Sequence, residues 1–252
     1  MPASDYRERI YSSYNTGRKK AVAPNDLGGL EPRLPELRRM IRASLDGNRD
    51  SEILDLGCGY GAFLHALRQL GYKNARGVDG SMEQVEAAAQ LGIAGVEYGH
   101  IMPTLAETKT SSLDTVVTFD VIEHFKKDEL IALVDEVRRV LKEGGRWIIH
   151  IPNAEGPFSS RIRYSDFTHE LAFTRVSIDQ LLRASGFVDV KCMEDGPTVR
   201  GVRSAIRYCL WRAIRVVLLG YLAIETGSFD RNAIFSQNFL AVGINGPSGS
   251  SS

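Results

Sequence analysis

A glycine-rich segment at residues 53–62 constrains the fold of this chain more than any other feature. Its sequence, Ile53-Leu-Asp-Leu-Gly-Cys-Gly-Tyr-Gly-Ala62, joins an apolar strand to a helix through Gly57, Gly59 and Gly61. Glycines let the backbone turn sharply and approach a ligand closely, and the first turn of a helix offers unpaired N–H groups. The pattern predicts a nucleotide-type ligand at this turn, although several nucleotide-binding folds share it.

Two acidic residues narrow the kind of ligand. Asp55, inside the segment, is poorly placed to face a pyrophosphate but can accept hydrogen bonds from an ammonium group, which favours a nucleoside that carries an amino acid. Asp79 follows at the carboxyl end of the next predicted strand, where it can accept both hydroxyls of a ribose. The alternative role for Asp79 is to cap the helix that opens near Ser81.

Apolar segments on both sides of the glycine turn alternate between strand and helix patterns. We expect strands at 52–56, 75–78, from 96, and at 113–119, 147–151, 187–193 and 239–244, and helices at 62–70, 82–91, 128–141 and 177–185. Residues 113–119 are apolar on both faces, as in a central parallel strand. The alternation predicts an α/β fold with a doubly wound sheet that is covered on both faces.

The composition is that of an ordinary soluble protein and excludes several classes. The 31 basic residues balance the 31 acidic ones, and 43% of the residues are hydrophobic. This neutrality argues against a nucleic-acid partner. The three cysteines form no disulfide framework and no zinc-type spacing. Because the N-terminus has no apolar core segment of a signal peptide, we expect a cytoplasmic protein.

A polar segment follows the predicted strand 113–119 and is the third motif, after the glycine-rich segment and Asp79. It reads Asp120-Val-Ile-Glu-His124 and lies where open α/β sheets bind ligands. Together the DLGCGYG loop, Asp79 and this DVIEH segment resemble the class I S-adenosylmethionine-dependent methyltransferases, especially a bacterial group that acts on small molecules and glycans. The resemblance covers roughly residues 50–193 and the final strand.

The resemblance implies a Rossmann-like sheet of seven strands whose last strand is antiparallel, with S-adenosylmethionine as the cofactor. The loop and Asp55 would then hold the methionine part, Asp79 the ribose, and Met82 would lie against the adenine. His100 and Ile101 stand where such enzymes often carry an acidic residue near the adenine, so His100 either contacts the base or is an exposed loop residue. The implied cofactor site comprises Asp55, Gly57, Cys58, Gly59, Gly61, Asp79, Gly80, Met82, His100, Ile101, Asp120 and Val121.

Methyl transfer to a hydroxyl needs an aligned acceptor and a base, and two histidines are candidates for that base. His124 follows the fourth predicted strand, and His169 lies in the long loop after the fifth, in a D-x-x-H segment with Asp166. Each could instead have a structural role. A metal held by some of these residues and Glu123 is a less favoured reading, and we expect none.

The segment before the last strand is basic. Five arginines and no acid lie between Gly196 and Glu225, and Arg200, Arg203 and Arg207 share one helical face. The segment could be a lid helix with a solvated basic face, a binding site for an anionic substrate, or a peripheral membrane contact, which we expect less. We place Tyr14, Arg18, Asp166, Arg200 and Arg203 at the acceptor.

We therefore divide the chain into an N-terminal helical cap (1–48), a cofactor-binding core (49–193), a basic helical insertion acting as a lid (194–236), a final strand (237–244) and a disordered tail (245–252). The expected function is methylation of a small molecule or glycan, at oxygen, with an anionic sugar or polysaccharide precursor as one candidate acceptor. The alternatives are a non-catalytic cofactor-binding module, an N-methyltransferase of a small metabolite, and an NAD-dependent oxidoreductase, against which Asp55 argues. The protein could be a monomer or a homodimer.

Overall fold

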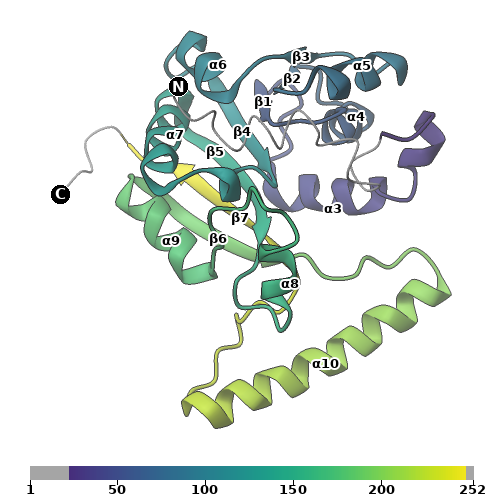
Figure 1. Ribbon diagram of the computed structural model, residues 1–252, viewed down its shortest axis with the longest axis vertical. Coiled ribbons are helices and arrows are strands. Elements are labelled where there is room, and N and C mark those ends of the chain that lie inside the picture. The colour runs from purple at the N-terminus through teal and green to yellow at the C-terminus, as the bar shows by residue number, and fades with distance from the viewer. Residues whose placement is uncertain (1–22, 248–252) are drawn as a thin grey trace, which may run out of the picture.

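The fold is a seven-stranded sheet with the strand order β3-β2-β1-β4-β5-β7-β6, as seen in a computed structural model that describes residues 23–247 (Figure 1). Strands β1 to β5 run parallel, and β7 is antiparallel to both of its neighbours. The strands are β1 (Ile53–Leu56), β2 (Ala75–Asp79), β3 (Val96–Tyr98), β4 (Leu113–Phe119), β5 (Leu141–Pro152), β6 (Phe187–Glu194) and β7 (Asn238–Asn245). The predicted fold class, with its antiparallel last strand, is confirmed.

Helices cover both faces of this sheet because successive strand residues point to opposite sides. Ile53 packs with α3, α4 and α5, whereas Leu54 and Leu56 pack with α6, α7 and α9. The helical elements are η1 (Leu27–Leu30), α3 (Leu34–Ser44), α4 (Ala62–Gln69), α5 (Met82–Gln90), α6 (Ile101–Glu107), η2 (Ile122–His124), α7 (Lys127–Val140), α8 (Ser159–Arg163), α9 (Arg175–Ala184) and α10 (Val202–Thr226). Among the described helices, none is long and apolar enough to cross a membrane.

One helix and the ends of two strands differ from the sequence prediction. Helix α6 was not expected; Pro103 lies in its first turn, where a missing N–H costs little. Strand β5 begins at Leu141 and includes Gly144 and Gly145, which we expected to separate helix from strand. Strand β7 extends to Asn245, which we assigned to the tail. Its side chain is buried and its amide donates to the carbonyl of Leu141, so the ordered chain continues beyond 244.

Helix α10 is the outlying element of the fold. None of its 25 residues is buried, and it runs along the lower edge of the molecule in Figure 1, with the sheet and the other helices on one side of it. Arg215 connects it to the rest of the protein, since the guanidinium donates to the carbonyl of Ala233 and lies 3.4 Å from the Glu194 carboxylate. This arrangement differs from that of a lid packed against the domain.

Candidate functional site

A cavity of about 940 Å³ lies at the carboxyl ends of the parallel strands β1, β2 and β4. Such strand ends are the usual ligand site of open α/β sheets. All the predicted cofactor residues line it except Gly61, and His124 lines its edge. Sequence reasoning missed Arg33 and Leu37, which reach the cavity from α3, and Phe119 at the end of β4. No short-range pattern in the sequence connects α3 to the strand ends.

Two glycines give the loop after β1 a shape that other residues cannot adopt without strain. Gly57 has φ +73°, and a Cβ there would lie 2.6 Å from Cγ2 of Val121. Gly61 has φ +79°, and a Cβ there would lie 2.7 Å from Cγ2 of Val96. Positive φ values favour glycine because it lacks a Cβ. Gly57 therefore admits the DVIEH segment beside the loop, whereas Gly61 shapes the loop from outside the cavity.

Asp79 holds the glycine loop through its carboxylate. One oxygen accepts from the Gly59 amide and the other from the Ser81 amide, each at 2.8 Å. Asp79 does not cap α5, the alternative role that we considered for it. The helix begins at Met82, and neither of the two amide donors belongs to its first turn. Burial raises the pKa of this carboxyl above its ordinary value.

Asp55 is a buried carboxyl with an unsatisfied oxygen. Its side chain is 1% exposed, and Oδ1 has no hydrogen-bond partner among the described residues. Burial, with a smaller contribution from the charge of Asp79, raises the pKa of Asp55 to about 8. A buried acceptor without a donor favours a cationic ligand at this position. The residues therefore fit a cofactor whose amino-acid part carries an ammonium group.

Cys58 lies in the same loop and has an unreactive thiol. Burial, together with the nearby charges of Asp55 and Asp79, raises the pKa of its thiol far above the ordinary range. Because the thiolate is the nucleophilic form of cysteine, a thiol with a raised pKa has little reactivity. Its contribution to the site is the shape of the loop.

Asp120 belongs to a charge network around the buried His150, which the sequence did not suggest. It has φ +53°, and its Oδ1 lies 2.8 Å from Nδ1 of His150 on β5. Nε2 of His150 lies 3.4 Å from Asp195, which is paired with Arg39 of α3. Burial alone would lower the pKa of His150, but Asp120 and Asp195 outweigh it and raise the pKa to about 10. The network holds Asp120 at the cavity wall.

His124, which lines the cavity, takes part in a chain of polar contacts. Its Nδ1 lies 2.9 Å from Oγ1 of Thr168, and that hydroxyl donates to Asp166 at 2.7 Å. A hydroxyl has one proton to give. Since Thr168 gives it to Asp166, Oγ1 accepts from Nδ1–H of His124, and Nε2 carries the basic lone pair. Burial, with the charge of His169 second, lowers the pKa of His124 to about 4, which keeps the ring neutral.

Glu123 and His169 complete this end of the site. The rings of His124 and His169 meet edge to face with centroids 4.8 Å apart. Glu123 is fully buried, and in the described chain neither carboxylate oxygen has a hydrogen-bond partner, so burial raises its pKa well above the ordinary value. Glu123, His124 and His169 each offer one ligand atom within 4.8 Å of the others and could hold a metal ion.

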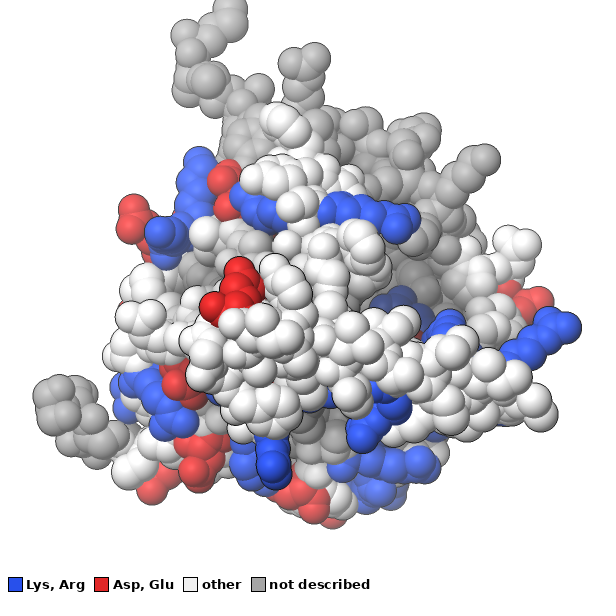
Figure 2. All heavy atoms as spheres, turned by 90° about the horizontal axis from the view of Figure 1, so that it is seen from below, with Lys and Arg blue, Asp and Glu red and all other residues white. Residues whose placement is uncertain are grey.

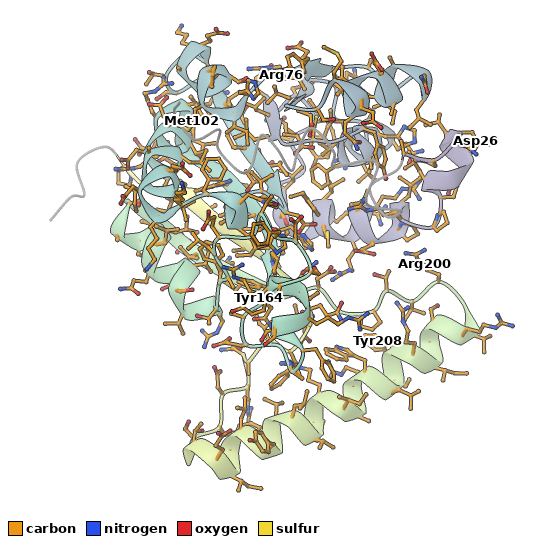
Figure 3. All side chains as sticks on the ribbon, viewed as in Figure 1. Asp26, Arg76, Met102, Tyr164, Arg200 and Tyr208 are labelled. Atoms are coloured by element: carbon orange, nitrogen blue, oxygen red, sulfur yellow. The ribbon has the colours of Figure 1, made fainter. Side chains whose placement is uncertain are left out.

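Of the residues that we assigned to the acceptor, the described ones do not line the cavity. Asp166 is buried and bound to Thr168, so it acts on His124 and does not line the cavity. Arg200 lies on the segment that leads to α10 (Figure 3), and neither it nor Arg203 lines the cavity. Tyr14 and Arg18 lie outside the described residues.

The opposite environments of His124 and His150 predict opposite titrations. We expect His124 to remain neutral until the pH falls to about 4, and His150 to remain protonated until the pH rises to about 10. Because the folded pKa of His150 is raised, its stabilising contribution is full below about pH 6.5 and is lost as the pH rises through about 10. Ring-proton NMR of the five histidines, assigned with single substitutions, measures both values. Titration of both rings near pH 6.5 would contradict the two environments.

Comparison with known proteins identifies a methyltransferase domain in this chain. A methyltransferase-domain family matches residues 31–191. The tRNA U34 carboxymethyltransferase of Pseudomonas paraeruginosa is 27% identical over 157 residues, which are 58% of this chain and 48% of that protein. The ubiquinone biosynthesis O-methyltransferase of Neisseria meningitidis is 28% identical over 109 residues, or 40% and 45% of the two chains. This chain thus matches about half the length of these relatives.

Solved structures share the fold at lower identity. A SAM-dependent methyltransferase from Archaeoglobus fulgidus aligns with a TM-score of 0.65 and 21% identity, over 85% of this chain and 94% of that one. A phosphoethanolamine N-methyltransferase from Haemonchus contortus, in complex with S-adenosyl-L-methionine, aligns with a TM-score of 0.55 and 16% identity, over 84% and 52% of the two chains.

Proposed function

This chain belongs to the S-adenosylmethionine-dependent methyltransferases, and from that premise we propose that it methylates an oxygen atom of a small-molecule or glycan acceptor. The observation that carries the proposal is the contact chain from Asp166 through Thr168 to His124, which presents a neutral imidazole at the edge of the cavity. An imidazole that is neutral near pH 7 has its Nε2 lone pair available to accept the proton of a hydroxyl acceptor.

The cavity residues divide into those that hold the cofactor and those that act on the acceptor. Asp55 receives the ammonium group, the Gly57–Gly61 loop surrounds the methionine part, and Asp79 accepts the ribose hydroxyls while it holds Gly59. Met82, half exposed at the start of α5, covers the adenine together with Ile101. His100 lines the cavity beside Gly80, which supports a contact of His100 with the adenine.

The bound cofactor supplies a methyl group made electrophilic by the sulfonium. The protein aligns the acceptor hydroxyl with that methyl group, and Nε2 of His124 accepts the hydroxyl proton as the oxygen–carbon bond forms. Thr168 and Asp166 keep the proton on Nδ1 and stabilise the imidazolium that results. The bond that would break is the S–CH3 bond of the cofactor, which would leave S-adenosylhomocysteine, while the hydroxyl proton is held on Nε2 of His124.

The acceptor is best described by the side chains that line the cavity. Met102, Phe119 and Phe125 line it together with His124, and they suit an aromatic or apolar acceptor. The anionic sugar that the arginines suggested gains no support, since Arg200 and Arg203 do not line the cavity. Similarity to an enzyme of ubiquinone biosynthesis, named as an O-methyltransferase, supports an oxygen acceptor, whereas similarity to a tRNA-modifying enzyme makes tRNA the second candidate.

The test is a screen of acceptors with a cofactor whose methyl group is tritiated. The panel contains phenols and catechols, neutral and anionic sugars, amines, and bulk tRNA, each incubated with and without a chelator. We expect the label to appear on an oxygen of a small acceptor, with turnover unchanged by the chelator. Label on an amine or on tRNA alone would contradict the proposal. Turnover that is lost with the chelator and restored by a divalent cation would assign Glu123, His124 and His169 to a metal site.

A further inference from the structure

Helix α10 exposes a continuous apolar face that no other part of the described chain covers. With 3.6 residues per turn, positions 202, 206, 210, 213, 217 and 224 follow one side of the helix. The large apolar residues on and beside this line are between 55% and 88% exposed, and they are Val202, Ile206, Leu210, Val216, Val217, Tyr221 and Ile224. Arg203 and Arg207, which we expected on a basic face of this helix, are exposed beside the apolar face.

The opposite side of α10 faces the protein, which fixes the direction of the apolar face. Trp211, Arg215 and Leu218 are half-buried on that side. Arg215 is held by Glu194 and by the carbonyls of Arg231 and Ala233. The apolar face therefore points away from the sheet. Figure 1 shows that α10 forms the outer edge of the molecule, so a flat surface can meet the helix along its length of about 37 Å.

The charges beside the apolar face are almost all positive. Arg203 and Arg207 lie along one border and Arg212 along the other, and Glu225 near the end of the helix is its only acid. Figure 2, which views the molecule from this side, shows a broad area of uncharged side chains with an acidic group at its left and Lys and Arg side chains, with some Asp and Glu, around it. Arginines at such a border can keep their guanidinium groups among lipid headgroups while their stems lie over apolar surface.

We propose that α10 docks in the plane of an anionic lipid bilayer, with its apolar face in the interface and its arginines on the headgroups. Helices with a wide apolar face and basic borders lie in this way on membranes. A second copy of the chain is the rival occupant, but paired helices bury a narrower seam and would place these arginines against one another with little acid to offset them. The proposal rests on α10 and goes beyond the methyl transfer proposed above.

Vesicle sedimentation with the full chain tests this docking. We expect the protein to sediment with phosphatidylcholine vesicles that contain phosphatidylglycerol, and at least tenfold less with phosphatidylcholine alone. Since each arginine near an anionic surface strengthens binding roughly fivefold, replacement of Arg203, Arg207 and Arg212 by glutamine is expected to weaken binding about 100-fold. Val217→Asp places a charge in the apolar face and is expected to weaken it at least tenfold.

The matched control is Val176→Asp, which changes a similarly exposed valine on α9. We expect this variant to bind the vesicles as the wild type does, and circular dichroism shows whether each variant remains folded. Equal binding of Val217→Asp and wild type, or no binding to anionic vesicles, would overturn the proposal. A homodimer in sedimentation velocity that Val217→Asp dissociates, without vesicle binding, would assign the face to a second copy and also overturn it.

Discussion

Replacement of His124 by alanine is expected to reduce kcat by about 100- to 10,000-fold, the range in which a positioned general base contributes. The reason is that Nε2 of His124 is the basic nitrogen at the edge of the cavity, as the contacts of Nδ1 with Thr168 require. Turnover of the acceptor found in the screen measures the effect. The affinity for S-adenosylhomocysteine is expected to change less than twofold, since the contacts assigned to the cofactor lie at Asp55, Asp79 and the glycine loop.

The contact chain behind His124 gives this prediction a finer test. Thr168→Val removes the hydroxyl between the imidazole and Asp166, so we expect a smaller loss of kcat and a changed pH profile, with KM little altered. His65→Ala is the matched control, because His65 lies on α4, contacts Gln69 and does not line the cavity. A loss of kcat below about threefold in His124→Ala would contradict the role of His124 as the base.

The order of elements and most of the cavity could be predicted because the signals are local. The run 113–119 is apolar on both faces, and the glycine loop joins strand to helix within a few residues. The topology of a parallel sheet then brings the ends of β1, β2 and β4 together without further information. Helix α6 was missed because it is one of the shorter helices and carries Pro103 in its first turn.

The charge network at His150, the contacts of His124 and the orientation of α10 could not be predicted, because they depend on contacts between distant segments. His150, Asp195 and Arg39 come from β5, the segment after β6, and α3, and only the fold brings them together. The carboxylate of Asp166 binds Thr168, whose hydroxyl contacts His124 at a separation of 44 residues, and no local pattern predicts that contact. The amphipathic character of α10 can be read from the sequence, but its direction depends on the pairing of Arg215 with Glu194.

The second prediction with a large expected effect is a loss of cofactor affinity when Asp79 is replaced. We assign the carboxylate of Asp79 to both the ribose and the glycine loop. Asp79→Ala removes the two hydrogen bonds expected to the ribose hydroxyls and releases the Gly59 amide. Each hydrogen bond to a charged group contributes about 1.5–3 kcal/mol, so affinity for S-adenosylhomocysteine is expected to fall roughly 100-fold or more. Glu97→Ala, which removes an exposed acid on the adjacent strand β3, is the matched control and is expected to bind as the wild type does.

Calorimetric titration of the wild type and these two variants with S-adenosylhomocysteine, with NAD as a second ligand, tests the central claim most directly. The account predicts tight binding to the wild type and to Glu97→Ala, much weaker binding to Asp79→Ala, and no binding of NAD. Equal affinity of Asp79→Ala and wild type would show that the cofactor does not occupy the cavity at the strand ends. Binding of NAD in place of S-adenosylhomocysteine would contradict the assigned chemistry of Asp55 and the glycine loop.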